Sequence, residues 1–364
     1  MSDNEQGENE RGLKSCDSHF LEPEKFYYER LPASKRSVAP RLIEIDGVLH
    51  WTDTFSMVPV ETSIACFQDV ENVSFRGGVG KWREVSDLQL RKGYHDHDYL
   101  LSEILLPDGG LLWRIRDYQT KLMCFDIYNE YSSEVEKKYE GVFYMPKVIP
   151  TASPSVALEY AEKAIDCRSS TNSVVVDLGF VSSAITDSEY SRFFEVLNEA
   201  SIILILHANG FSTTHQFRYP YSAKTTMFCV NAMNFLIDSY MRSFFDKYDQ
   251  IKVYFSEVGY KWIDHILDKV PFYCDRYCSL EKITPIQKPI DQVVADSVFF
   301  GFTNDLPCDY YLRKLARNLL FGSDFPHADS SYGSSRQHFN STSDISMEYA
   351  ERVFRRNAED LFGI

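Results

Sequence analysis

The chain has 364 residues, of which 44% are hydrophobic and 15% aromatic, enough apolar side chains for a large core. This length suits either two ordinary domains or one large α/β barrel. The formal net charge of −15 argues against nucleic acid or an anionic membrane as the main partner, because such surfaces would repel the chain.

The first residues, MSDNEQGENERG, are polar and acidic and contain no apolar signal-peptide core. We expect residues 1–12 to form a disordered tail and residues 13–364 to form one domain. The longest strongly apolar run, SIILIL at 201–206, is too short to span a bilayer. The scattered cysteines favour a reducing cytoplasm, and the spacing of Cys274 and Cys278, without a second pair, predicts ordinary thiols rather than a zinc knuckle.

Short β-branched or aromatic runs recur along the chain and are separated by longer segments of helical character. The predicted strands cover residues 13–16, 100–107, 141–148, 173–180, 201–206, 251–256, 296–302 and 318–323. The clearest helical segments between them cover 111–139, 153–165, 187–200 and 223–248, and SMEYAERVFRRNAEDLF closes the chain. This alternation predicts a (β/α)8 TIM barrel. A doubly wound open sheet is the alternative, but no Gly-rich dinucleotide loop follows the first strand.

Residues 36–92 interrupt the alternation. RLIEIDGVLHW predicts a hairpin that turns at Asp46 and Gly47, and the Gly-rich stretch RGGVG follows it. We expect an insertion after the first strand that covers part of the barrel mouth.

The stretch GYHDHDYLL, residues 93–101, offers His95 and His97 between two aspartates and looks like a metal site. It comes directly before the second predicted strand, however, at the end of the barrel opposite to the active groups. If it ends the preceding helix, the two imidazoles point to different sides of that helix. We interpret the stretch as a solvated face.

Metal-competent side chains follow four of the predicted strands at their carboxyl ends, where barrel enzymes carry their active groups. They are Asp17 and His19 after strand one, His207 after strand five, Glu257 after strand six, and Asp324 and His327 after strand eight. A histidine after a strand is more often structural than a ligand, but these ends converge in a barrel. Nitrogen and oxygen ligands in this mixture suit Zn²⁺ or Mn²⁺.

The sequence resembles the amidohydrolase superfamily, in the branch that includes aminocarboxymuconate-semialdehyde decarboxylase and the metal-dependent benzoate-type decarboxylases. The stretches that carry the resemblance, from Leu13 to Ile364, are CDSHFLEPEKFYYERLP, IYNEY, YEGVFYMP, ILHANG, SEVGYKWIDHIL, LLFGSDFPHADSSYGSSR and RRNAEDLFGI. The most specific of them are the GSD-aromatic-PH element and the closing N-A-x-x-L-aromatic-G-I.

The resemblance implies one divalent ion, Zn²⁺ in the first place and Mn²⁺ as the alternative. Its ligands would be Asp17, His19, His207 and Asp324, with Asp17 in place of the family's first histidine. The resemblance also implies that Asp324 activates water or substrate. Glu257 stands where decarboxylases of this branch often have a histidine, and it is a candidate acid/base. His327 is a candidate for tuning Asp324 or holding substrate, or for fixing its own loop.

Further candidates lie near the same strand ends. Asn209 and Arg218 follow strand five and are candidate substrate-binding residues, since arginine binds carboxylates in a bidentate manner. His215 is expected in a solvated loop. Asp177 could bridge to a second ion, but a hydrogen-bonding role inside the barrel is favoured. Trp262 is a candidate for stacking on substrate, with packing under the strand-six loop as the favoured role.

Three functions are compatible with these residues. The first is non-oxidative decarboxylation of a small cyclic or aromatic carboxylic acid. The second is hydrolysis of an amide, lactone or cyclic C–N bond with metal-bound water as the nucleophile. The third, a non-catalytic barrel scaffold, is disfavoured because four metal-competent strand ends occur together. The expected partners are a small-molecule substrate and, as an open alternative, a second copy of the chain in a homodimer.

Overall fold

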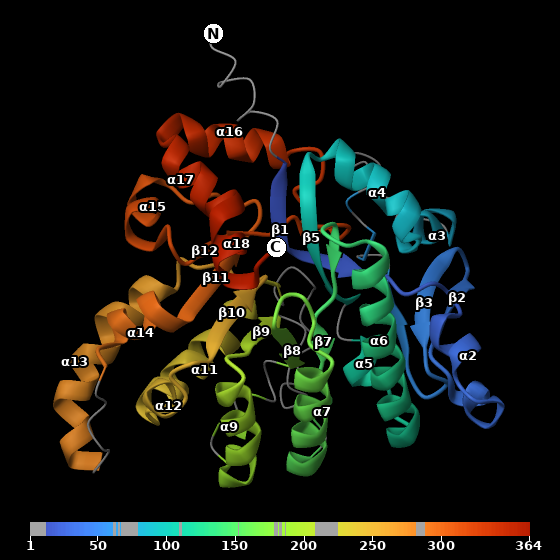
Figure 1. The fold of residues 1–364 in the computed structure, drawn as a ribbon, viewed down its shortest axis with the longest axis horizontal. Coiled ribbons are helices and arrows are strands. Elements are labelled where there is room, and N and C mark those ends of the chain that lie inside the picture. The colour runs from blue at the N-terminus through green and yellow to red at the C-terminus, as the bar shows by residue number, and fades with distance from the viewer. Residues whose placement is uncertain are drawn as a thin grey trace.

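The computed structural model describes residues 12–60, 63–64, 66, 79–108, 111–151, 153–177, 181, 184–185, 187–207, 225–281 and 288–364. Strands gather around a central axis and helices surround them (Figure 1). The predicted tail lies outside the described residues except for Gly12. The division of the chain into a tail and one domain stays a prediction.

All eight predicted strands are present. They are β1 (Leu13–Phe20), β5 (Leu100–Pro107), β6 (Phe143–Tyr144) with β7 (Lys147–Val148), β8 (Ser173–Asp177), β9 (Ile203–His207), β10 (Lys252–Ser256), β11 (Val298–Phe302) and β12 (Leu319–Phe321). The third predicted strand is divided into β6 and β7 at Pro146, which has no amide hydrogen for the ladder. The first is longer than predicted, because the polar residues Asp17 and His19 continue the strand to Phe20.

The strands pair in parallel in the orders β1-β5-β6 and β7-β8-β9-β10-β11-β12. Main-chain hydrogen bonds connect the chain that follows β12 to β1: Asp324 N donates to Asp17 O, and His19 N donates to Phe325 O, both at 2.8 Å. The carboxyl ends of the first and last strands therefore lie side by side. The architecture is the predicted (β/α)8 barrel.

The barrel helices lie on the outside of the strands (Figure 1). They include α5 (Leu111–Arg114), α6 (Tyr118–Lys138), α7 (Pro154–Asp166), α9 (Ser191–Glu199), α11 (Phe228–Met241), α12 (Phe244–Lys247), α13 (Ile263–Glu281), α14 (Ile290–Ser297) and α15 (Asp309–Leu315). The chain closes with α16 (Ser335–Ile345), α17 (Met347–Glu351), the π-helical turn η5 (Arg352–Arg356) and α18 (Asn357–Phe362). Polar caps fix several helix starts; the side chain of Ser153, for example, accepts from Val156 N with Pro154 in the first turn.

The insertion contains the predicted hairpin. After α2 (Phe26–Arg30) and η1 (Ala33–Val38), strands β2 (Arg41–Ile45) and β3 (Val48–Thr52) pair antiparallel, and β4 (Met57–Pro59) joins β3. Asp46 and Gly47 have φ values of 52° and 79°, the left-handed conformation that a two-residue hairpin turn requires. Ser63 Oγ donates to Asp108 just past the end of β5, and Cys66 N donates to Pro326 O past the end of β12. Part of the insertion thus lies against the carboxyl-end loops.

The HDHD stretch ends α4 (Leu88–His97), which follows α3 (Val79–Ser86). His97 is exposed, whereas His95 is buried and its ring contacts Phe143. The two imidazoles point to different sides of the helix, as predicted, but the solvated interpretation is wrong for His95. Asp98 is also buried and accepts hydrogen bonds from Gly333 N and Ser335 Oγ, so it has a structural role.

Every cysteine of the chain lies among the described residues, and none of them forms a disulfide. Cys274 and Cys278 are half-buried on α13. Among the helices that the structure describes, none is long and apolar enough to cross a membrane.

Glu22, two residues beyond β1, is a buried acid with 4% of its surface exposed. Tyr27 Oη donates to its Oε1 at 2.9 Å, and Trp82 Nε1 of the insertion donates to its carbonyl oxygen at 2.8 Å. Burial, and next the negative charge of Asp108, raise the pKa of Glu22 from 4.5 to about 8. Its ionisation therefore opposes folding between these two pH values.

We expect Glu22→Gln to raise the unfolding temperature at pH 8 and to change it little at pH 5. The unfolded chain ionises Glu22 above pH 4.5 whereas the folded chain keeps its proton up to about pH 8, so wild-type stability falls as the pH rises through this window. Thermal unfolding of both proteins at both pH values is the measurement. An equal shift at the two pH values would show that the charge of Glu22 does not matter.

Candidate metal centre

The barrel brings six of the predicted site residues together. Asp17 and His19 alternate along the end of β1 and point to the same side, while Ser18 between them hydrogen-bonds to Glu103 and Ser323. His207 is the last residue of β9, and Glu257 directly follows β10. The remaining two, Asp324 and His327, lie in the loop after β12.

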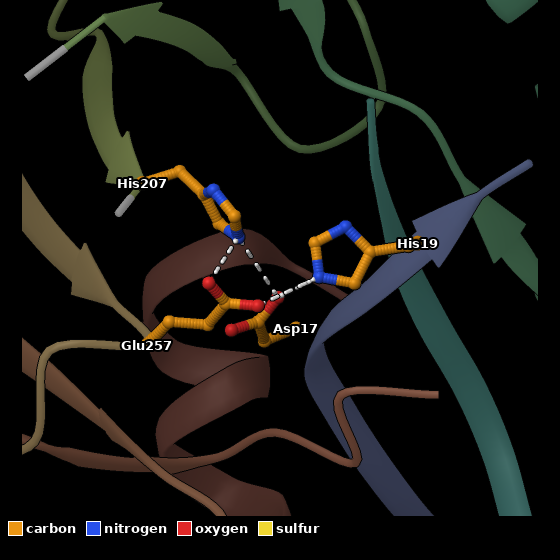
Figure 2. A group of neighbouring side chains, drawn as sticks. All are labelled: Asp17, His19, His207 and Glu257. Carbon is orange, nitrogen blue, oxygen red and sulfur yellow. Dashed lines mark hydrogen bonds and ion pairs between the residues drawn. The ribbon is translucent and has the colours of Figure 1, made fainter. Parts of the chain in front are cut away.

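Imidazole and carboxylate atoms meet at the centre of this group. His19 Nε2 lies 3.0 Å from Glu257 Oε1, 3.0 Å from Asp324 Oδ1 and 3.7 Å from Asp17 Oδ1. His207 Nε2 lies 3.3 Å from Glu257 Oε2 and 3.9 Å from Asp17 Oδ1. Figure 2 shows both imidazoles directed at the two carboxylates from separate strands.

Several of these atoms lack the hydrogen bonds that buried polar atoms normally have. Asp17 Oδ1, His207 Nε2 and Asp324 Oδ1 are buried and find no hydrogen-bond partner within the described parts of the chain, although opposite charges lie within 4 Å. His19 Nε2 lies within 4 Å of both aspartate oxygens, and His207 Nε2 lies within 4 Å of the oxygen of Asp17. This arrangement fits a shared cation.

Two overlapping sets of residues place their ligand atoms within 4.8 Å of one another. The sets are Asp17, His19, His207 and Glu257, and His19, Glu257, Asp324 and His327. Nitrogen and carboxylate donors of this kind bind Zn²⁺ and Mn²⁺. The residues present therefore fit one divalent ion, and Glu257 belongs to both sets.

Burial and mutual charge perturb the protonation of this group. Burial raises the pKa of Asp17 to about 6, against the opposing effect of His207. Burial and His327 disfavour protonation of His19, but its contacts with Asp324 and Glu257 outweigh them and raise its pKa to about 9. Burial favours protonated Glu257, yet His207 and the hydrogen bonds from the histidines hold its pKa well below the usual value. Perturbed groups that cluster in this way are typical of functional sites.

The backbone around the acids is constrained. Glu257 and Asp324 have φ values of 59° and 50°, a left-handed conformation that non-glycine residues rarely adopt and that occurs often at functional sites. A Cβ atom on Gly322 would lie 2.6 Å from Asp17 Cβ, so only glycine lets β12 approach β1 here. Close approach of the strands brings Asp324 to Asp17.

Three residues that support the site were not predicted. The buried Arg91 binds Glu103 and donates to the carbonyl oxygens of His19 and Phe325, which fixes both backbones. Ser256 Oγ donates to Asp17 Oδ2. Asp108 lies 3.0 Å from His327 Nε2. Since Asp108 directly follows the second barrel strand, the strand-end rule could have found it.

The softer candidates have different outcomes. Asn209, His215 and Arg218 lie outside the described residues. Asp177 pairs in register with His207, but it belongs to neither set of converging ligand atoms. Trp262 Nε1 donates to Val258 O and Gly259 O, and the ring is absent from the lining of the cavity described next. These contacts support the packing role of Trp262 rather than the stacking role.

A cavity of about 340 Å³ opens beside the centre. Glu257, Asp324 and His327 form one wall of it. Its other described walls come from the start of α11 and from the loops after β10, β11 and β12, and include Thr225, Phe228, Thr303, Asp305 and Asp329. A volume of this size accommodates a small molecule next to the converging side chains.

Solved structures share the architecture over nearly the whole chain, although no protein-family model matches the sequence and no curated protein is similar enough to count as a relative. An amidohydrolase from Mycobacterium avium subsp. paratuberculosis is 13% identical with a TM-score of 0.72, covering 97% of this chain and 98% of its own. The 5-carboxyvanillate decarboxylase from Sphingomonas paucimobilis is 14% identical with a TM-score of 0.70, covering 97% and 99%.

A 5-carboxyvanillate decarboxylase from Novosphingobium aromaticivorans, with bound manganese and a nitrobenzoic acid, is 15% identical with a TM-score of 0.70, covering 98% and 99%. At such identities the likeness concerns the fold. It agrees with the resemblance that the strand-end residues carry in the sequence. The chain therefore shares the (β/α)8 barrel fold of these amidohydrolase and decarboxylase structures.

Proposed function

We propose that this protein is a metal-dependent decarboxylase of a small cyclic or aromatic carboxylic acid. The observation that carries the proposal is a cluster of three acids and three imidazoles from four strand ends, of which Glu257, Asp324 and His327 line a cavity of small-molecule size. Three of these residues, Asp17, His19 and His207, are almost completely buried, so the cluster presents its open side to the cavity. That is the arrangement that a bound substrate would require.

Asp17, His19, His207 and Asp324 would hold the ion. When bound, a divalent ion would supply the positive charge that attracts a substrate carboxylate and stabilises negative charge on a neighbouring oxygen. We propose Zn²⁺ as the first candidate because these residues offer both nitrogen and oxygen donors. Mn²⁺ is the alternative, supported by the manganese in the structurally similar decarboxylase.

Proton transfer is assigned to Glu257, with His327 beside it. Decarboxylation breaks the bond between a ring carbon and its carboxylate, and the electron pair left on the carbon must take up a proton as CO₂ leaves. Glu257 lines the cavity, and its Oε1 lies 3.3 Å from His327 Nδ1. A proton held between these two groups is therefore within reach of a substrate in the cavity.

Hydrolysis of an amide, lactone or cyclic C–N bond is the second candidate, and the similar fold of the mycobacterial amidohydrolase supports it. The same four ligands would serve both reactions. Decarboxylation ranks first because two of the structurally similar enzymes decarboxylate 5-carboxyvanillate. In addition, the fourth barrel strand ends in Asp177 rather than in a lysine that could bridge two ions.

The purified protein should contain close to one tightly bound divalent ion per chain. His207→Ala should remove most of it, because His207 Nε2 is one of the buried converging atoms. Elemental analysis after dialysis measures the content. Full metal content in the variant would contradict the role of His207.

The matched control is the double variant His95→Gln and His97→Gln. Those imidazoles belong to α4 and to neither converging set, so the metal content should stay at the wild-type value. Loss of metal from a folded control would place the ion at the HDHD stretch instead.

Screening of hydroxylated and methoxylated benzoic acids for CO₂ release tests the reaction itself. The metal-loaded protein should release CO₂ from at least one of them, and metal removal should abolish the release. If amides or lactones are cleaved and no carboxylic acid loses CO₂, the hydrolase candidate replaces the first proposal.

Asp324 and Glu257 should respond differently to amide substitution. Asp324→Asn should weaken metal binding and stop turnover, because it removes a ligand charge. Glu257→Gln should retain the metal and lower kcat by about 10²–10⁴-fold, the usual contribution of a general acid–base group. Metal content and kcat of both variants decide the assignment. Loss of metal from Glu257→Gln would make Glu257 a ligand, in line with its place in both converging sets.

A further inference from the structure

The three imidazoles of the centre differ in the hydrogen-bond partners of their ring nitrogens. His19 Nδ1 and His207 Nδ1 are buried and have no hydrogen-bond partner in the described part of the structure. Both nitrogens of His327 have partners: Nε2 lies 3.0 Å from Asp108 Oδ1, and Nδ1 lies 3.0 Å from Asp324 Oδ1 and 3.3 Å from Glu257 Oε1. His327 is thus the imidazole whose orientation is set by a carboxylate outside the centre.

Asp108 is itself held in place. It lies directly after β5 with 1% of its surface exposed, and its second oxygen, Oδ2, accepts from Ser63 Oγ at 3.0 Å. Ser63 belongs to the segment inserted after β1. A continuous series of contacts therefore runs from the insertion through Asp108 and His327 to Glu257 at the cavity wall.

The orientation of the His327 ring needs such a partner. The ring stacks on His19 with centroids 3.7 Å apart and an interplanar angle of 21°. Stacking fixes the plane of the ring but not a half-turn within that plane, which would exchange nitrogen and carbon positions at Glu257. A carboxylate oxygen accepts hydrogen bonds, so the contact of Asp108 Oδ1 with Nε2 favours the ring orientation that places a protonated Nε2 there and Nδ1 at Glu257.

We propose that Asp108 is a positioning residue for proton transfer: it fixes the orientation of the His327 ring so that Nδ1 faces Glu257, and Ser63 fixes Asp108. The inference rests on the proposed function in assigning proton transfer to Glu257. It adds a residue that touches neither the cavity nor the converging ligand atoms. It also gives the insertion a part in the chemistry.

Asp108→Asn tests the proposal. With Ser63 donating to the amide oxygen, the amide NH₂ faces His327 Nε2 and forces this nitrogen to accept, so the ring must give up the proton on Nε2 or turn. We expect kcat to fall by about 10- to 100-fold, the usual effect of removing a group that orients an active-site histidine, while metal content and KM change little. Combining Asp108→Asn with His327→Gln should reduce kcat no further than His327→Gln alone, because the two act through one contact.

Asp98→Asn is the matched control. Asp98 lies at the opposite end of β5, is 3% exposed, and also accepts from a serine hydroxyl, that of Ser335. This variant should retain the wild-type kcat even if its unfolding temperature falls. An equal loss of kcat in both variants would show that Asp108 acts through general stability, and the proposal would be wrong.

Nitrogen NMR of the zinc-loaded protein, with ¹⁵N-labelled histidine, provides a readout that needs no substrate. The His327 ring signals, identified by their disappearance in His327→Gln, should show a proton on Nε2 in the wild type and a changed pattern in Asp108→Asn. Unchanged signals would overturn the inference. If the wild type binds no metal, the proposed function fails, and the same spectra of the metal-free protein still decide whether Asp108 holds the proton on His327 Nε2.

Discussion

The central constraint on this structure is the crowding of three carboxylates around one imidazole, with two of the three, Asp17 and Asp324, buried. Asp17, Glu257 and Asp324 all approach His19 Nε2 within 4 Å, and like charges at this spacing repel one another strongly in a medium of low dielectric. Contacts with Asp324 and Glu257 raise the pKa of His19 to about 9, so this imidazole offsets part of the repulsion by taking up a proton. A divalent cation would offset it more completely, and it would leave the histidines neutral, the form in which they bind metal.

Holding the acids in this position requires rigid support. Asp324 and Glu257 adopt left-handed backbone conformations, and such strain persists only where the surroundings determine the conformation fully. Gly322 allows β12 to approach Asp17 closely, and Arg91 binds the carbonyl groups on both sides of the junction between the first and last strands. The closure of the barrel and the assembly of the centre therefore depend on the same contact, the one between β1 and the loop after β12.

The insertion after β1 connects this centre to the outside of the barrel. Its Trp82 caps the carbonyl group of Glu22, and its Ser63 holds Asp108, which in turn binds His327. The same segment thus supports a buried acid whose charge opposes folding and a series of contacts that ends at the cavity. Chemistry in this fold resides at the carboxyl ends of the strands, and segments that are added there can acquire functional contacts without altering the barrel.

The sequence by itself determined the order of strands and helices, because the periodicity of apolar residues is a local property. It also determined which strand ends carry acids and imidazoles, and from these the six residues of the centre. Tertiary structure decided the burial of His95 on α4, since Phe143, which contacts it, lies on the separate strand β6. It also decided the contact between Asp108 and His327, two residues that are 219 positions apart in the sequence. The position of Glu257, with one carboxylate oxygen near His19 and the other near His207, likewise depends on the tertiary structure. Contacts across a barrel depend on strand register and closure, and no local pattern of residues encodes them.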